Sequence, residues 1–268
     1  MKNRIPDYFQ LHKYNVTPET IVGYYLGCDR NAIRPNVIVT PIWPVKVFSQ
    51  VAGNITSIKE RRVYQMEYKG HLITLIRSGI GAPLTGDVIL ALGCTHCERL
   101  IFTGSVGGLD PSMEIGDLVV PEKSFSGDGF SRYLEKDIRT TNCFLDPAEP
   151  DAHDTRNVKA IAAKICEKES VALHSGAVFS IDTVLAQFFH LDYVVRRYEC
   201  IEIEMETAAV FKAAKLVGIK ASALLQVSDV IPKNKTIYSG RTKEEMQRQR
   251  TIRERIVAQA VVDAIIYN

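Results

Sequence analysis

Phe102-Thr-Gly-Ser-Val-Gly-Gly-Leu109 begins inside an apolar run, Leu100–Thr103, that has the length and composition of a buried strand. Its glycines let the backbone approach a ligand closely, and Ser105 adds a hydroxyl among exposed backbone N–H groups. In an open sheet, ligands bind beyond the carboxyl ends of the strands, where this segment would lie. Taken alone, the pattern fits an anion- or sugar-binding loop and fits a plain tight turn equally well.

The rest of the chain alternates apolar runs with helical patterns, which favours a parallel or mixed sheet covered by helices. Strands are predicted at Val37–Thr40, Val63–Tyr68, Leu72–Arg77, Leu100–Thr103, Leu118–Val120, Ala177–Ser180 and Ala221–Val227. Helices are predicted from about Pro83 to Gly93, Val158 to Lys168, Glu206 to Val217 and Thr242 to Tyr267. The Lys69-Gly70 pair between two of these strands predicts a hairpin.

The composition is that of an ordinary globular protein, with 46% hydrophobic and 24% charged residues among 268. No linker-like tract divides the sequence, so we expect a single domain over residues 1–268. The net charge of +2, from 33 basic and 31 acidic residues, gives no electrostatic reason to expect nucleic acid as a partner. We find neither a secretory signal nor a membrane-spanning apolar run of roughly 20 residues, and we expect a cytoplasmic protein with no membrane partner.

Three other motifs indicate weaker alternatives. Ser78-Gly-Ile-Gly81 is similar to the start of a dinucleotide-binding loop, but Leu84 stands where the third glycine belongs. Cys94-Thr-His-Cys97 has no second Cys/His pair at ligand spacing, so we expect ordinary thiols and no metal site. The arginines of the segment Arg248–Arg255 predict a solvated helix face over a packed one rather than a membrane surface.

Two acidic features follow strands further along the chain. In Glu202-Ile-Glu204-Met-Glu206, alternate positions place the carboxylates on one side of a strand end where a helix begins. Asp229 stands just after the apolar run Ala223–Val227. Singly, a structural role explains each of them better than catalysis does, Glu206 as a helix N-terminal charge and Asp229 as a strand-end cap.

Four blocks in order make the sequence resemble the nucleoside phosphorylase superfamily, which includes purine nucleoside and uridine phosphorylases and the methylthioadenosine nucleosidases. The blocks are Arg77-Ser-Gly-Ile-Gly-Ala-Pro83, Phe102–Leu109 with Ile115-Gly-Asp-Leu-Val-Val120, Phe179-Ser-Ile-Asp-Thr183, and Ile203-Glu-Met-Glu-Thr-Ala-Ala209 with Val227-Ser-Asp229. The resemblance implies an α/β protein with the single-domain nucleoside-phosphorylase-like fold, a mixed central sheet flanked by helices. It also implies a homo-oligomer, dimer or hexamer, and no cofactor, with phosphate as co-substrate.

The same resemblance assigns roles to the two acids. Because both acids stand at the family's positions, these roles are preferred over the structural explanations of Glu206 and Asp229. Glu206 should hold the ribose hydroxyls while Met205 packs against the sugar, and Asp229 should protonate N7 of a leaving purine. Because the uridine phosphorylases lack this aspartate, Val-Ser-Asp argues for a purine-like base. The other implied substrate-binding residues are Gly104, Ser105, Glu204, Val184 at the position of the family's base-stacking aromatic, and Gln187, with Phe188 or Phe189 as alternatives for the base contact.

The expected phosphate site departs from the family's pattern. Where the phosphorylases have Gly-Asp-Pro-x-Arg, this chain has Pro41-Ile-Trp-Pro-Val-Lys46, so Lys46 replaces the first phosphate arginine. Phe102 aligns with the second arginine, and the third, which a neighbouring subunit supplies, maps near Lys59 or Arg61. The predicted phosphate-binding residues are therefore Lys46, Ser105, Lys59 and Arg61, although lysine lacks the bidentate fork of arginine.

From these residues we expect cleavage of the N-glycosidic bond of a purine-like nucleoside by phosphorolysis, giving free base and sugar 1-phosphate. Phosphate is narrowly favoured over water because Lys46 and the Lys59–Arg62 cluster supply positive charge. One alternative is a nucleosidase of the same fold, although Thr40–Phe48 lacks the acids by which the nucleosidases handle water. The other is a catalytically silent nucleoside-binding protein. In either reaction negative charge grows on the leaving base, so Asp229 must hold a proton near neutrality and needs a raised pKa.

Overall fold

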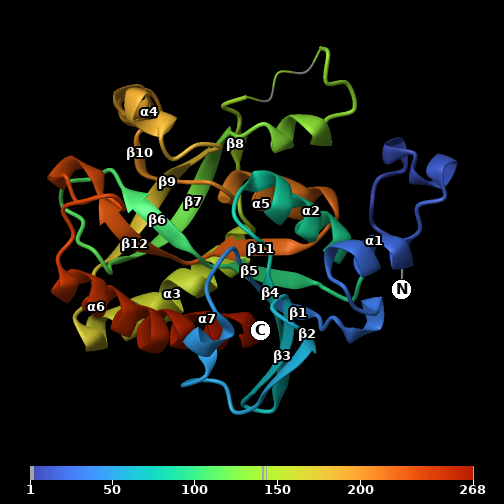
Figure 1. The fold of residues 1–268 in the computed structure, drawn as a ribbon, viewed down its shortest axis with the longest axis horizontal. Helices are drawn as coiled ribbons and strands as arrows, with labels where there is room; N and C mark the ends of the chain where they lie inside the picture. The colour runs from blue at the N-terminus through green and yellow to red at the C-terminus, as the bar shows by residue number, and fades with distance from the viewer. Residues whose placement is uncertain (1–2, 141, 143, 268) are drawn as a thin grey trace.

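The computed structural model describes residues 3–140, 142 and 144–267, and their strands form two six-stranded sheets (Figure 1). The first sheet has the order β11 (Lys220–Ala223), β5 (Arg99–Phe102), β1 (Asn36–Thr40), β4 (His71–Arg77), β3 (Val63–Tyr68), β2 (Ile55–Lys59). The second has the order β12 (Leu225–Val230), β6 (Ser105–Gly108), β10 (Cys200–Glu204), β9 (Leu173–Ile181), β7 (Leu118–Gly127), β8 (Pro147–Ala148). Both sheets mix parallel and antiparallel pairs, so the predicted mixed α/β fold is confirmed. The strands are divided between two sheets rather than gathered in one.

Helices cover both faces of the first sheet. The helices are α1 (Pro18–Tyr25), α2 (Ala82–Leu92), α3 (Ala152–Glu169), α4 (Leu191–Tyr198), α5 (Thr207–Leu216), α6 (Lys243–Ile252), the π-helical turn η8 (Arg253–Val257) and α7 (Ala258–Ile266). Short 3₁₀ turns are η1 (Asp7–Phe9), η2 (Leu11–Tyr14), η3 (Arg30–Ala32), η4 (Val45–Phe48), η5 (Phe130–Leu134), η6 (Ala186–Phe189) and η7 (Ile231–Lys233). Val39 of β1 belongs to the hydrophobic cluster of α2 and α5, whereas Ile38 belongs to that of α3 and α7. Successive residues of a strand face opposite sides, which places helices on both faces.

The two sheets share a hydrophobic core. Val39 of β1, in the first sheet, and Val227 of β12, in the second, belong to the same buried cluster. We therefore propose that the chain folds as the single domain expected from its sequence. Within the described residues, no helix combines the length and the hydropathy needed to cross a bilayer.

The element bounds differ from the predicted ones in instructive places. The hairpin at Lys69-Gly70 is confirmed by the antiparallel pairing of β3 with β4. The single strand predicted at Ala221–Val227 is wrong, because the chain leaves the first sheet at Leu224 and enters the second. Ser105–Gly108 is a strand rather than a turn, since its glycines hide the alternation of apolar residues that marks a strand. The helix predicted over Thr242–Tyr267 is interrupted by the π-turn η8.

Side-chain caps set the starts of two long helices. The hydroxyl of Thr242 accepts from the backbone N–H of Glu245 at 3.1 Å, and the Glu245 carboxylate accepts from the N–H of Thr242 at 2.8 Å, so α6 begins with a capping box. Asp151 accepts from the N–H of Asp154 at 2.9 Å. That cap starts α3 well before Val158, where the apolar periodicity alone had predicted it.

Two helical glycines give a matched test of packing against helix propensity. A Cβ added to Gly86 in α2 would lie 2.2 Å from a ring carbon of Phe130, whereas one added to Gly23 in α1 meets nothing within 4 Å. Alanine is favoured over glycine in a helix by up to about 1 kcal/mol, but overpacking costs about 1–3 kcal/mol. Gly86→Ala should therefore lower the free energy of unfolding in urea and Gly23→Ala should not. Equal effects of the two substitutions would show that Phe130 does not pack there.

Candidate functional site

One cavity of about 220 Å³ gathers most of the residues predicted from the sequence. Its lining takes in the predicted residues Ser105, Val184, Gln187, Glu204, Met205, Glu206 and Asp229. They come from β6, η6, β10, the residues that lead into α5, and β12, together with the loop that separates β9 from η6. Gly104 is the residue before this lining and accepts a backbone hydrogen bond from Gln226 at 3.0 Å. Phe188 and Phe189 do not line the cavity.

Glu206 is held by the glycine turn that precedes α2. Its Oε1 accepts from the backbone N–H of Gly81 at 2.6 Å, and the side chain is only 5% exposed. Gly79 and Gly81 have φ of +101° and +96°, which only glycine adopts without strain. The segment Ser78–Gly81, whose sequence is similar to the start of a dinucleotide-binding loop, therefore presents a backbone donor to the carboxyl group of Glu206. Burial raises the pKa of Glu206 to about 8, and the charge of Glu204 adds to the rise.

The carboxylate of Glu204 is occupied by the protein itself. Its Oε1 accepts from the hydroxyls of Ser180, at 2.5 Å, and Thr207, at 2.8 Å. Its Oε2 accepts from the backbone N–H groups of Glu206, at 2.7 Å, and Thr207, at 2.8 Å. Glu204 therefore fixes the start of α5 and with it the position of Glu206. Its predicted contact with substrate stays a prediction.

Asp229 lies within β12 rather than just beyond a strand, and it is 7% exposed. Its Oδ1 accepts from the Ser228 hydroxyl at 2.5 Å. Gly107, on the neighbouring strand β6, pairs with Asp229. A Cβ added to this glycine would lie 3.2 Å from Oδ2 of Asp229, so the glycine makes room for the carboxyl group. Burial raises the pKa of Asp229 above its usual range, while the bond from Ser228 and the charge of Arg241 limit the rise. The group thus tends to keep the proton that an acid catalyst needs.

The three basic residues predicted to bind phosphate do not line this cavity. Lys46 lies in η4 and is exposed. Lys59 lays its aliphatic chain against Gly27. Arg61, at φ +62°, belongs to an exposed turn, with its side chain 87% exposed. Within the described part of this chain, the predicted phosphate site is therefore represented at the cavity by Ser105 alone.

Neither Trp43 nor Arg253 was predicted as a site residue, yet Trp43 contacts Ser105 and Arg253 packs against Trp43. The indole of Trp43 is 1% exposed, and its Nε1–H donates to the Ser105 hydroxyl at 3.3 Å. The guanidinium of Arg253 lies 5.5 Å from the centroid of the Trp43 ring. One signal was available: a lone tryptophan stands where the family's phosphate loop departs from its pattern. Arg253 itself is a correction, because the sequence placed it on a solvated face.

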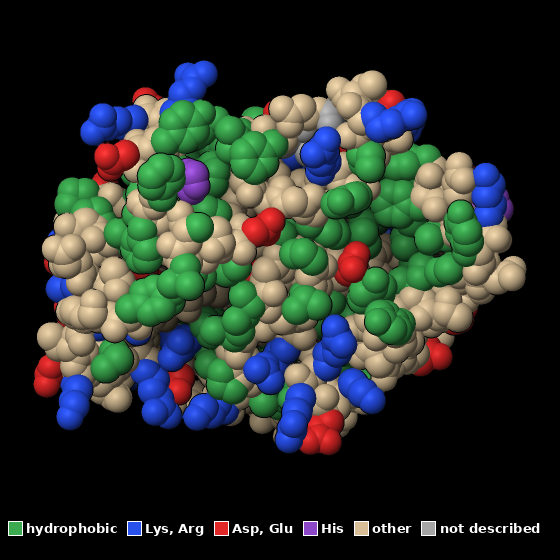
Figure 2. Space-filling view, turned by 45° about the horizontal axis from the view of Figure 1, so that its top comes forward, with side chains coloured by type: hydrophobic (Ala, Val, Ile, Leu, Met, Phe, Trp, Pro, Cys, Tyr) green, Lys and Arg blue, Asp and Glu red, His purple; other side chains and the backbone are tan. Residues whose placement is uncertain are grey.

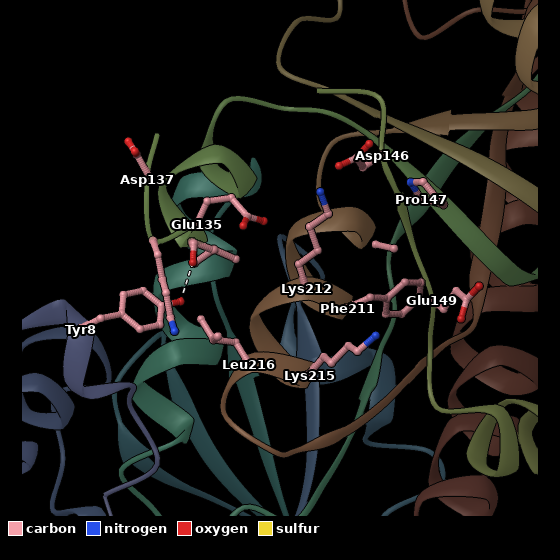
Figure 3. Close-up of a pocket in the computed structure, with 13 residues that line it drawn as sticks. Tyr8, Glu135, Asp137, Asp146, Pro147, Glu149, Phe211, Lys212, Lys215 and Leu216 are labelled. Atoms are coloured by element: carbon pink, nitrogen blue, oxygen red, sulfur yellow. Dashed lines mark hydrogen bonds between the residues drawn. The ribbon is translucent and has the colours of Figure 1, made fainter. Parts of the chain in front are cut away.

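A larger hollow of about 890 Å³ lies elsewhere, against the C-terminal half of α5 (Figure 3). Tyr8 donates to the carbonyl of Leu134 at 2.6 Å on one side of it, and Lys212 and Lys215 point into it from α5. Its rim carries both acidic and basic side chains, among them Glu149 and Lys215. It includes none of the carboxyl groups with raised pKa described above, so the smaller cavity is the better candidate for chemistry. Burial also raises the pKa of Cys94 to about 11 and that of Cys97 to about 12, which makes both thiols poor nucleophiles.

The raised pKa of Glu206 makes stability depend on pH. Between the ordinary pKa of 4.5 and about 8, the folded state holds a proton that the unfolded state releases, so the free energy of unfolding falls as pH rises through this window. Glu206→Gln removes this dependence. From about pH 5 to about pH 9, wild type should lose on the order of 2–5 kcal/mol more than the variant, because each tenfold change in proton affinity is about 1.4 kcal/mol. Parallel urea-unfolding curves for the two proteins across this range would contradict the shift.

Comparison with known proteins connects this geometry to a family. The model of the phosphorylase superfamily matches residues 38–266. The purine nucleoside phosphorylase of DeoD type from Mycoplasma genitalium is 24% identical over 74% of this chain and 80% of its own length. Among solved structures, uridine phosphorylase from Vibrio fischeri has a TM-score of 0.71 and 22% identity, covering 89% of this chain and 94% of that one. The 5'-methylthioadenosine/S-adenosyl homocysteine nucleosidase of Campylobacter jejuni has a TM-score of 0.66 and 16% identity, covering 85% of this chain and 97% of that one. Nucleoside phosphorylases of this family use phosphate as co-substrate and need no cofactor. The resemblance found in the sequence is confirmed: the chain belongs to the phosphorylase superfamily.

Proposed function

We propose that this protein cleaves the N-glycosidic bond of a purine-like nucleoside, with Asp229 as general acid and Glu206 as the partner of the sugar. One observation carries the proposal. Glu206 and Asp229, each buried and each with a raised pKa, line the same small cavity, and neither carboxyl group is occupied by the protein as fully as that of Glu204. Paired acids with shifted pKa in a cavity are typical of catalytic sites.

The chemistry uses both groups in different ways. As the bond from C1′ to the base nitrogen breaks, positive charge grows on the sugar and negative charge on the base. Asp229 delivers its proton to the base, an effect worth roughly 10²–10⁴-fold in rate. Glu206 hydrogen-bonds the ribose hydroxyls, and a hydrogen bond of this kind contributes about 0.5–1.5 kcal/mol. Met205 lines the cavity beside it and supplies an apolar surface for the sugar ring.

The remaining walls suit a flat heterocycle. Ile181, Val184 and Ile237 give aliphatic surfaces where the family's phosphorylases have a stacking aromatic, and the buried amide of Gln187 offers a donor and an acceptor. A purine-like base is supported by Asp229, since only a base that must be protonated needs an acid here. Because relatives of both the purine and the uridine type resemble this chain, the base is the part of the proposal that substrate assays decide.

Two acceptors are open to this chemistry. Phosphorolysis, the sequence-based expectation, is supported by curated relatives named as phosphorylases. Hydrolysis is favoured by the cavity, since no lysine or arginine is found among the described residues that line it. A catalytically silent nucleoside-binding protein is the least favoured alternative. Binding alone would not require the raised pKa of Asp229, nor the glycine at position 107 that makes room for its carboxyl group.

We also propose that the chain assembles with copies of itself. Three isoleucines that line the cavity are about half exposed: Ile42 at 44%, Ile80 at 54% and Ile237 at 44%. Two further apolar side chains, close in sequence to the lining residues Val184 and Gln187, are more exposed: Leu185 at 74% and Phe189 at 88%. Hydrophobic side chains gather over the middle of the face drawn in Figure 2, with lysines and arginines along its lower rim. Contiguous exposed apolar surface of this kind is typical of protein interfaces.

Replacing the acid tests the proposal directly. Asp229→Asn keeps the size of the side chain but cannot transfer a proton, so release of free base from inosine or adenosine should fall by roughly 10²–10⁴-fold. A nitrophenyl riboside, whose leaving group needs no proton, should lose much less. Asp192→Asn, at a side chain 90% exposed, is the matched control and should keep wild-type rates. Equal losses on both substrates would mean that Asp229 only shapes the strand, and no base release by wild type from any nucleoside would refute the function.

A further inference from the structure

We propose that Trp43 excludes phosphate from the cavity, so that water is the acceptor and the protein is a nucleoside hydrolase. The inference rests on the proposed cleavage of a nucleoside and names its second substrate. It concerns the acceptor of the sugar. The predicted phosphate-binding residues Lys46, Lys59 and Arg61 do not identify this acceptor, since none of them lines the cavity.

The first step is the position of the indole. Ser105 of the glycine segment lines the cavity. Trp43 is buried directly behind this lining, and its Nε1–H donates to the Ser105 hydroxyl at 3.3 Å. The neighbouring Ile42 also lines the cavity, and its carbonyl accepts from Nη2 of Arg77 at 3.0 Å. The segment that carries Trp43 is therefore fixed at the place where an anion would meet the Ser105 hydroxyl.

The second step is the cation that packs against the indole. Arg253 lies against the Trp43 ring at 5.5 Å, and its Nε is buried with no hydrogen-bond partner among the described residues. A guanidinium over an indole face is an attractive arrangement, strongest where water is excluded. Arg253 thus stabilises the indole in place, and it does not line the cavity itself.

The third step is the charge that an acceptor would meet. The titratable side chains that line the cavity are Glu204, Glu206 and Asp229, with no lysine or arginine among the described lining residues. The Ser228 hydroxyl is already given to Asp229. Bringing a phosphate dianion into this buried site without a cation carries a large desolvation penalty, which a neutral water molecule avoids.

Space favours the same acceptor. The cavity measures about 220 Å³, below the roughly 300–1,000 Å³ of typical small-molecule pockets, so a nucleoside leaves little volume for a second substrate. In the hydrolysis, the C1′–N bond breaks, the oxygen of water bonds to C1′, and the proton of Asp229 goes to the base. A proton released by that water restores Asp229. The products are free base and free sugar, and no other reactant is needed.

The chain has one tryptophan, so its emission reports this position alone. Inorganic phosphate titrated into wild type should leave the emission unchanged, and nucleoside cleavage should proceed at the same rate with and without phosphate, giving reducing sugar and no sugar 1-phosphate by ³¹P NMR. A phosphate-dependent emission change or any sugar 1-phosphate would overturn the inference. If wild type cleaves no nucleoside, the proposed function fails, while the emission titration still decides whether phosphate is excluded.

Substitution of Trp43 separates exclusion from the rest of the site. Trp43→Ala opens space between the Ser105 hydroxyl and Arg253, and should gain phosphate-stimulated base release with sugar 1-phosphate as product. Trp43→Phe keeps an aromatic ring of similar bulk and should stay indifferent to phosphate, as should Arg255→Ala, at an exposed arginine of the same π-turn. A folded Trp43→Ala that ignores phosphate, or a Trp43→Phe that uses it, would overturn the role of Trp43. Should Trp43→Ala fail to fold, Trp43→Phe and the emission titration of wild type decide.

Discussion

Four hydrogen-bond donors converge on the carboxylate of Glu204, and through this buried contact β9, β10 and α5 are tied together. The hydroxyl of Ser124 on β7 extends the network, since it contacts both Ser180 and Thr207. Glu206 is the N-cap residue of α5, so its distance from Asp229 depends on where this network places the first turn of the helix. A buried network of this kind specifies geometry strongly only when every member has its hydrogen-bond partners. Here both oxygens of the Glu204 carboxylate accept hydrogen bonds.

The site concentrates carboxyl groups in a region with few cations, and burial raises the pKa of each of them. Glu202 on β10 is fully buried, and neither of its oxygens has a hydrogen-bond partner among the described residues. Burial, together with the charge of Glu204, raises the pKa of Glu202 well above its ordinary value. A neutral acid costs far less to bury than a carboxylate. The same low polarity that raises these pKa values also strengthens any charge that develops on a substrate inside the cavity.

The sequence predicted the family, the mixed α/β fold and the acids that line the cavity, because those features reside in local patterns of glycines, acids and apolar runs. It could not predict that Ser105–Gly108 is a strand, since glycines chosen for close approach to Asp229 carry no apolar alternation. It placed Lys46 at the phosphate site by position along the chain, whereas the structure turns this lysine outward in η4. Alignment gives order along a loop and not the direction in which each side chain leaves it.

The π-turn η8 has a consequence for the phase of the C-terminal helix. A π-turn is the equivalent of one residue inserted into an α-helix, and each residue advances a helix by about 100°. Because the π-turn takes up this residue within one wider turn, deleting one residue between Arg253 and Val257 would restore a regular α-helix and keep the apolar stripe of α7 on the core. With the extra residue in place, the same helix presents Arg253 to the Trp43 ring and Val261 to the core. A change in the length of this turn therefore changes the surroundings of Trp43 while the helix that covers the first sheet keeps its packing.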